Sequence, residues 1–242
     1  MLLLCTGMAF AGSLEPGLGW AHAQLNDRHQ TPLPYGASGP QVRLGVAATP
    51  ARARLFGRFE AQVGGASAPV ERALSEASWI DAALEIGGDA QISSGRTRVY
   101  VGASVGKRLE LIDGMALHVW GLGTGALGAR LRVEREVGRV GLAGEVTVPV
   151  VVAISRHNWS LDPVVPGRGD VAAFYTVGTR LVAVGQLLDM RARVEVTLPV
   201  TERVQWGLTA SARYLTYPEP APVRRLALDL STGPRVALGG RS

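Results

Sequence analysis

Long stretches in which apolar and polar residues alternate constrain the fold of this chain more than any other feature. In residues 79–93, WIDAALEIGGDAQIS, apolar side chains occupy every second position and polar or charged side chains recur between them. A period of two residues places successive side chains on opposite faces of a β-strand. From residue 41 onward we find no segment with the spacing of an amphipathic helix. The sequence therefore predicts an all-β protein.

The alternating segments are long, and most of their connections are short. We expect strands at residues 53–65, 77–93, 96–110, 115–135, 139–155, 170–187, 190–201, 203–216, 223–231 and 234–241. Strands of globular proteins average about five or six residues, whereas strands that cross a bilayer obliquely need roughly nine to eleven. Because lipid cannot satisfy an open sheet edge, a membrane-spanning sheet must close. The pattern predicts an antiparallel up-and-down transmembrane β-barrel of about ten strands, with eight to twelve left open.

The two faces of the alternation differ in charge. One face consists mainly of Val, Leu, Ala and Ile, which suits contact with lipid, and the other carries Arg, Asp and Glu, which suits a lumen. The charged residues that we expect in the lumen are Asp81, Glu85, Asp89, Arg98, Arg130, Arg132, Glu134, Glu145, Arg180, Arg191, Arg193, Glu195 and Arg213. They form either a plug of paired charges or the wall of a narrow pore with a weak preference for anions. We favour the plug, because a small barrel is nearly filled by its side chains and unpaired buried charges are costly.

The pattern E-V-T-x-P-V occurs twice, at residues 145–150 and 195–200. We expect Glu145 and Glu195 to face the lumen. Because proline lacks an N–H group, we expect Pro149 and Pro199 at a bulge, an edge or the barrel rim. In the strand count above, both copies lie on strands that run toward the outside.

The N-terminus has the pattern of an export signal. An apolar stretch too short to span a bilayer is followed by AHAQ at residues 21–24, a small-x-small cleavage pattern, and residues 9–11 (AFA) are a second candidate site. We expect a signal peptide over residues 1–23, a flexible periplasmic leader over 24–40 and the barrel over 41–242. The single cysteine, Cys5, lies in the expected signal, so the mature protein would enter an oxidising periplasm without cysteine.

Charge alone would also allow binding to nucleic acid, since the net charge is +5 and the pI is about 10.0. The arginines, however, are dispersed along the alternating segments with acidic residues among them, and no nucleic-acid-binding motif occurs. We therefore expect no nucleic-acid partner. We also find no metal-ligand cluster, phosphate-binding loop or cofactor motif, so we expect no cofactor and no metal.

Two further hypotheses remain open. An outer-membrane barrel enzyme of a hydrolase or acyl-modifying type would need a nucleophile and a base. His118 lies on a polar strand face, and His157 lies near Asn158, Ser160 and Asp162, but the spacing matches no known motif, so an enzyme is the minority hypothesis. A soluble periplasmic β-barrel or sandwich that binds a ligand would need its apolar faces to meet each other.

The AHAQ segment, the alternating strands and the closing segment GPRVALGGRS resemble bacterial outer-membrane β-barrel proteins as a broad class. The resemblance implies a cell outer-membrane location in a Gram-negative bacterium, after export through the periplasm. It implies outer-membrane lipid, lipopolysaccharide and the barrel-assembly machinery as partners, although this chain ends Gly240-Arg241-Ser242 where such barrels usually end in an aromatic residue. We expect a structural or surface-interaction role or a narrow porin-like pore, with loops 66–76 and 156–169 as contact surfaces. The residues expected in interfacial aromatic girdles are Trp79, Tyr175, Trp206, Tyr214 and Tyr217.

Overall fold

The structure is a computed structural model, and it describes residues 12–28, 34–68, 77–115, 118–158, 179–183, 185–219 and 222–238. The strands are β1 (Gly12–Asp27), β2 (Tyr35–Ala48), β3 (Ala53–Ser67), β4 (Ala77–Ser93), β5 (Thr97–Met115), β6 (His118–Val137), β7 (Val140–Asn158), β8 (Thr179–Ala183), β9 (Leu188–Pro199), β10 (Val204–Tyr217) and β11 (Val223–Leu238). No helix among these residues is long and apolar enough to span a membrane.

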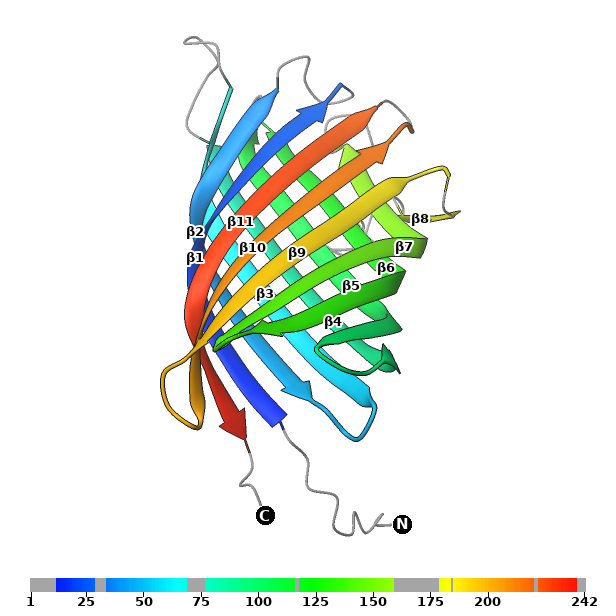
Figure 1. Cartoon of the computed structure of the whole chain (residues 1–242). Helices are drawn as coiled ribbons and strands as arrows, with labels where there is room; N and C mark the ends of the chain where they lie inside the picture. The colour runs from blue at the N-terminus through cyan, green and yellow to red at the C-terminus, as the bar shows by residue number, and fades with distance from the viewer. Residues whose placement is uncertain are drawn as a thin grey trace, which may run out of the picture.

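All of the strands belong to one closed antiparallel sheet (Figure 1). Apart from β8 and β9, which do not pair with each other, each strand pairs with its neighbours in the chain, and β1 pairs with β11 to close the barrel. Strands β8 and β9 both pair with β7, at its residues 151–155 and 141–147 respectively, so together they form a single interrupted barrel strand. The fold is therefore a closed ten-stranded antiparallel β-barrel, and the predicted fold class is confirmed.

The N-terminal boundaries differ from those expected. Strand β1 lies between β11 and β2, with Trp20 opposite both Leu230 and Pro40. Residues 12–23 of the expected signal and much of the expected flexible leader, residues 24–40, are therefore barrel strands. The alternation extends into this region as well, with alanines facing inward. Because small apolar residues are also typical of a signal sequence, the segment was assigned to the signal. Cleavage after Ala23 would remove most of β1 and open the barrel, whereas residues 1–11, which contain the second candidate site, lie outside the described residues.

The expected number of strands is correct because two strands counted in excess are offset by two strands that were missed. Residues 170–187 and 190–201 are not separate barrel strands, since β8 and β9 share one position, and residues 223–231 and 234–241 are replaced by the continuous β11. Strands β1 and β2 make up the difference. The E-V-T-x-P-V copies consequently lie on neighbouring antiparallel strands, not on two that run the same way.

The two prolines of the repeat lie where a missing N–H is tolerated. The register between β6 and β7 shifts at Pro149, which pairs with Gly128 while Val151 pairs with Leu127, so Val150 is bulged. The same level of the barrel is where β8 ends and β9 begins. Pro199 is the last residue of β9, at the rim. Both placements confirm the prediction that proline would sit at a bulge or rim.

Connections differ between the two ends of the barrel. Strand β1 begins and β11 ends at the lower end in Figure 1, which also carries the short turns 49–52, 94–96, 138–139 and 200–203. We call this the turn end. The opposite end, the loop end, carries the connections between β3 and β4 and between β7 and β8. Both expected contact loops therefore begin at the same end, although residues 69–76 and 159–178 lie outside the described part of the chain.

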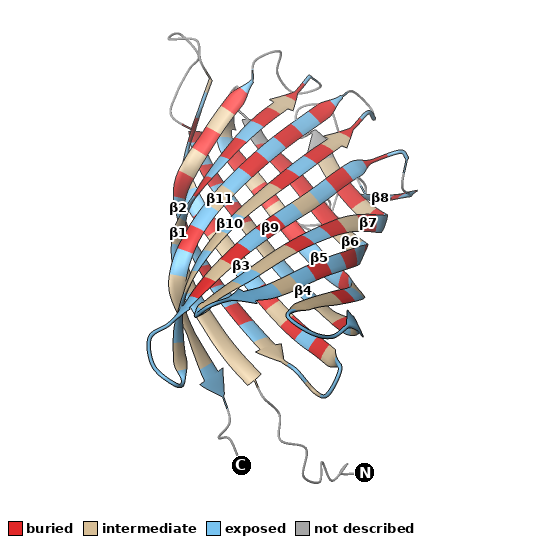
Figure 2. Ribbon diagram, in the orientation of Figure 1, coloured by how far each residue is buried: buried red, intermediate tan, exposed pale blue. Residues whose placement is uncertain are grey.

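Burial alternates along the strands, as Figure 2 shows. The outward positions carry many exposed large apolar side chains, among them Val42, Phe59, Leu84, Val105, Leu131, Val194, Leu208 and Leu228. Lys107 is an exception on this outer face, where it lines a hollow with apolar neighbours.

The expected aromatic girdle divides between the two faces. Trp206 and Tyr214 are exposed, but Trp79 and Tyr217 are buried, and the structure does not describe Tyr175. Trp79 and Tyr217 share an inward parity with buried neighbours on their strands, so the expectation of a girdle was wrong for these two residues.

The barrel interior as candidate functional site

The loop-end half of the lumen is filled by an apolar cluster. It contains two tryptophans that are almost completely buried, Trp79 from β4 and Trp120 from β6. A buried indole N–H needs an acceptor, and each has a carboxylate: Trp79 donates to Glu110 at 3.0 Å and Trp120 donates to Asp27 at 2.8 Å. The other large members of the cluster are Leu25, Tyr35, Ile112, Leu122, Val152, Ile154, Val182, Leu187, Leu215, Tyr217 and Val223.

The bulge at Val150 marks the boundary between this cluster and a charged half. Before the bulge, the inward residues of β7 include Glu145 and Thr147; after it, Val152 and Ile154 point inward. One extra residue changes which parity faces the lumen. The continuous apolar run VPVVVAI therefore supplies lipid-facing residues and an internal apolar lining from the same strand.

Three arginines converge on Glu145 in the charged half. Arg58 of β3 reaches across the lumen and donates to both carboxylate oxygens, at 2.6 and 2.8 Å. Arg130 and Arg132 of the neighbouring β6 donate at 2.6 and 3.1 Å. A bidentate guanidinium–carboxylate pair is a strong, directional contact, so this centre joins opposite walls of the barrel.

A second centre forms around Glu195 of β9. Its carboxylate lies 2.8 Å from Arg132, 3.1 Å from Arg193, 3.3 Å from Arg235 and 3.5 Å from Arg43. Because Arg132 contacts both Glu145 and Glu195, the two glutamates of the repeated sequence belong to one network. The repetition thus supplies two acidic centres at adjacent places in the barrel wall.

A third centre lies closer to the loop end. Asp81 accepts from Arg108 of the adjacent β5, with one Nε–Oδ1 distance of 2.7 Å, and from Arg225 of β11 at 2.7 Å. Arg225 also pairs with Glu110, the acceptor of Trp79. Arg213 and Asp189 form a separate bidentate pair with two distances of 2.7 Å. The charged network is therefore continuous with the base of the apolar cluster.

Phe56 is a buried aromatic residue inside the charged half. The guanidinium carbon of Arg130 lies 3.8 Å from the ring centroid, and those of Arg58 and Arg54 lie at 4.8 and 5.4 Å. An aromatic face attracts cations. The Phe56 ring therefore fills space among the arginines and partly compensates the electrostatic repulsion between them.

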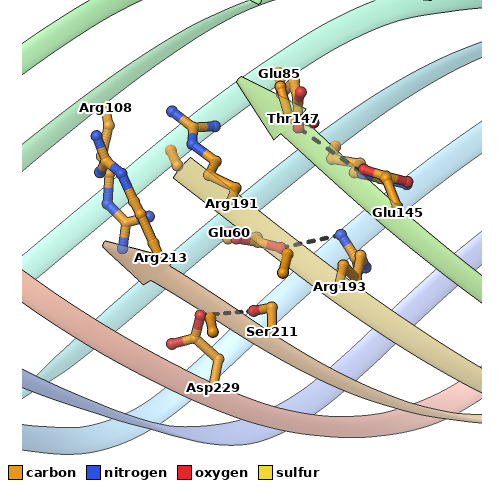
Figure 3. Close-up of a pocket in the computed structure, with 14 residues that line it drawn as sticks. Glu60, Glu85, Arg108, Glu145, Thr147, Arg191, Arg193, Ser211, Arg213 and Asp229 are labelled. Atoms are coloured by element: carbon orange, nitrogen blue, oxygen red, sulfur yellow. Dashed lines mark hydrogen bonds and ion pairs between the residues drawn. The ribbon is translucent and has the colours of Figure 1, made fainter. Parts of the chain in front are cut away.

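Little space remains between these groups. A cavity of about 50 Å³ lies among them, and Figure 3 shows side chains from several strands that line it. In it, Arg193 faces Glu60 at 3.5 Å and Ser211 donates to Asp229 at 2.8 Å, while Arg191 extends between the other side chains. A cavity needs about 10–15 Å³ of such space to hold one water, so this cavity has room for only a few waters. A larger cavity of about 330 Å³ at the turn end is lined in part by Arg132 and Glu195 of the network.

The structure places most of the sequence-predicted charges in this network. Those that are buried are Asp81, Asp89, Arg130, Arg132, Glu145, Arg193, Glu195 and Arg213. Glu85, Glu134 and Arg191 are partly buried and line the two cavities. Arg98 lies toward the turn end beside Glu134 and Glu136. Arg180 is a correction: it lies at the loop end, its side chain is 63% exposed, and it pairs with Glu219 outside the packed interior.

Sequence reasoning missed about as many interior charges as it found. They include Glu15, Asp27, Arg43, Arg54, Arg58, Glu60, Arg108, Glu110, Arg156, Asp189, Arg225, Asp229 and Arg235. The same alternation in residues 53–65 could have identified Arg54, Arg58 and Glu60. Glu15 and Asp27 were missed because their segment was assigned to the signal and leader.

The proposed enzyme residues are not tested by this geometry. His118 and His157 lie in β6 and β7, but their side chains are outside the described part of the structure. Among the residues that are described, no group of three His, Cys, Asp or Glu side chains is arranged to hold a metal ion.

Comparison with known proteins identifies the fold. No family model matches the chain, and no curated protein sequence matches it. Among solved structures, the outer membrane protease OmpT from Escherichia coli matches with a TM-score of 0.58 at 8% identity, over 96% of this chain and 99% of OmpT. This chain has the fold of a bacterial outer-membrane β-barrel. At this identity the likeness extends to the fold alone.

Two other outer-membrane barrels match less closely. The translocator domain of the autotransporter NalP from Neisseria meningitidis has a TM-score of 0.45 at 10% identity, over 97% of this chain and 91% of that one. Neisserial surface protein A (NspA) has a TM-score of 0.38 at 12% identity, over 93% of this chain and 97% of that one.

Proposed function

We propose that this protein is a plugged outer-membrane β-barrel that conducts no solutes and acts at the cell surface through its loop end, in a structural or surface-interaction role. The observation that carries the proposal is the filled lumen. An apolar cluster occupies the loop-end half, and the arginine–carboxylate network occupies the charged half.

The outer face of the barrel supports insertion into lipid. Large apolar side chains such as Val42, Leu84 and Val105 are about half exposed there, and no described layer of the chain covers them. A soluble barrel or sandwich would bury its apolar face and expose its charges, whereas a membrane barrel does the reverse. The charged interior therefore favours lipid, including lipopolysaccharide, as the outer surroundings of the barrel.

The geometry favours a plug over a pore. A pore needs a continuous water-filled path, but the cavity in the middle of the lumen has a volume of only about 50 Å³. Arg58 and Glu145 join across the lumen, and Arg132 links Glu145 to Glu195. Opening a path would require breaking several buried ion pairs at once, which is energetically costly.

The ends of the barrel support an orientation. Outer-membrane barrels have short periplasmic turns and longer external loops, so we assign the turn end to the periplasm. The connections at the loop end would then face outward, where loops on a rigid scaffold are suited to contact other molecules.

The proposal is tested by expressing the chain behind an export signal in a Gram-negative host. We expect protein in the outer-membrane fraction that migrates differently on a gel before and after boiling. A protease site inserted within residues 159–178 should be cut in intact cells, whereas the same site inserted at residues 94–96 should be cut only after the cells are opened. Soluble periplasmic protein without a boiling-dependent shift would contradict the proposal.

A further inference from the structure

Each of the four short turns at the turn end carries an exposed arginine. These are Arg52 in turn 49–52, Arg96 in 94–96, Arg139 in 138–139 and Arg203 in 200–203. Such turns recur at every second strand, so the side chains are distributed around the rim (Figure 1). We call this set the turn-end arginine ring. Within the described part of the chain, none of its guanidinium groups forms an ion pair.

The ring borders the apolar outer face of the barrel. Each arginine lies within four residues of an exposed apolar side chain on an adjoining strand or strand end, and Trp206 is exposed at the same end. The exposed neighbours are Leu55 beside Arg52, Ile92 near Arg96, Val137 beside Arg139, and Val200 and Trp206 beside Arg203. In a bilayer, the headgroup layer begins where the apolar band ends.

Few negative charges offset the ring. Among the described turns and strand ends at this end of the barrel, the exposed carboxylates are Glu136 and Glu202. Glu136 is engaged by Arg98, at 3.2 Å. Glu202 directly precedes Arg203 in its turn. The ring therefore retains an excess of positive charge over its exposed neighbours, unlike the interior, where carboxylates accompany the arginines.

We propose that the turn-end arginine ring binds the phosphate groups of anionic phospholipids in the leaflet around the turn end. The proposal rests on the membrane insertion argued above. Guanidinium groups match phosphate oxygens with paired hydrogen bonds, and long arginine stems can lie along apolar surface while their heads reach the headgroups. A basic residue near an anionic membrane surface typically favours association about fivefold.

The test compares lipid selectivity between matched variants. Wild type, R52Q/R96Q/R203Q and the control R28Q/R180Q/R224Q are refolded into phosphatidylcholine vesicles containing phosphatidylglycerol. The control removes three exposed arginines from the loop end, and Arg139 is retained because it also lines the turn-end cavity. Spin-labelled lipids give the association of phosphatidylglycerol with the barrel relative to phosphatidylcholine. Boiling-dependent gel mobility of the same samples reports insertion independently.

We expect wild type and control to prefer phosphatidylglycerol several-fold at low salt, and R52Q/R96Q/R203Q to lose more than half of that preference. Equal selectivity in all three proteins, or an equal loss in both variants, would overturn the proposal. Inorganic phosphate that abolishes the preference, where chloride of equal ionic strength does not, would indicate a free-phosphate site and also overturn it. Failure of wild type to insert would instead refute the membrane assignment.

Discussion

Replacing Glu145 with glutamine should cost this barrel several kcal/mol of stability. The glutamate accepts two hydrogen bonds from Arg58 and one each from Arg130 and Arg132, at 2.6 to 3.1 Å. Glutamine has nearly the same volume, so the change creates no cavity. It removes the negative charge and turns one accepting oxygen into an NH₂ group that faces cations.

The remaining contacts of the three arginines set the expected size of this effect. Removing one partner of a buried ion pair typically costs about 3–5 kcal/mol. Arg132 retains Glu195 at 2.8 Å and Arg130 retains Asp89 at 3.1 Å, while the carboxylate left to Arg58 among the described residues is the more distant Glu85, at 3.8 Å. Two of the three arginines thus keep a close carboxylate partner. We therefore expect a loss of stability near the lower end of that range, at about 3 kcal/mol.

Urea unfolding in phospholipid vesicles, followed by tryptophan fluorescence and gel mobility, measures this loss. Glu202→Gln is the matched control, because Glu202 is exposed in a turn and its replacement should change stability by no more than about 0.5 kcal/mol. The double variant E145Q/R58Q should be less destabilised than the sum of its single variants, by about 0.5–3 kcal/mol. If the unfolding free energy of E145Q lies within about 0.5 kcal/mol of that of wild type, the interior network does not hold the barrel together.

Three further changes test other parts of the fold by the same unfolding assay. Gly64→Ala should cost about 1–3 kcal/mol, because its added Cβ would lie 2.0 Å from a backbone oxygen of β2, whereas Gly144→Ala has open space and should be nearly neutral. Trp79→Phe should cost about 1.5–3 kcal/mol, because it removes the N–H donated to the carboxylate of Glu110. Val42→Arg, on the outer face near the middle of β2, should cost about 2–4 kcal/mol in lipid, and no loss would mean that this face does not contact lipid.

Most of the fold prediction rests on the alternation of apolar and polar residues. A period of two residues identifies strands and separates their faces, which is why Glu145 and Glu195 could be assigned to the interior from sequence. It does not report which strands are neighbours. The interrupted strand formed by β8 and β9 was therefore counted as two strands. The two copies of E-V-T-x-P-V were assigned to strands of the same direction, although they lie on neighbouring antiparallel strands.

Two other features could not be predicted from the local sequence pattern, for physical reasons. The segment 12–27 is rich in small apolar residues, and both a signal sequence and an inward-facing barrel strand have this composition. Long-range pairs such as Arg58 with Glu145 depend on how the barrel closes, which no local spacing encodes. Trp79 lies two residues before Asp81 on the same strand, so both side chains point into the lumen. An aromatic residue near a strand end also fits an interfacial girdle, which is why Trp79 was assigned to the outer face.

The most direct test of the plugged barrel is a current measurement on wild-type protein in a planar lipid bilayer. Insertion is first verified by boiling-dependent gel mobility in the same preparation. We predict no stepwise conductance, because Arg58, Glu145, Arg132 and Glu195 link opposite walls and the apolar cluster fills the loop-end half. Stable, reproducible single-channel steps from inserted wild-type barrels would show a continuous aqueous path and contradict the account.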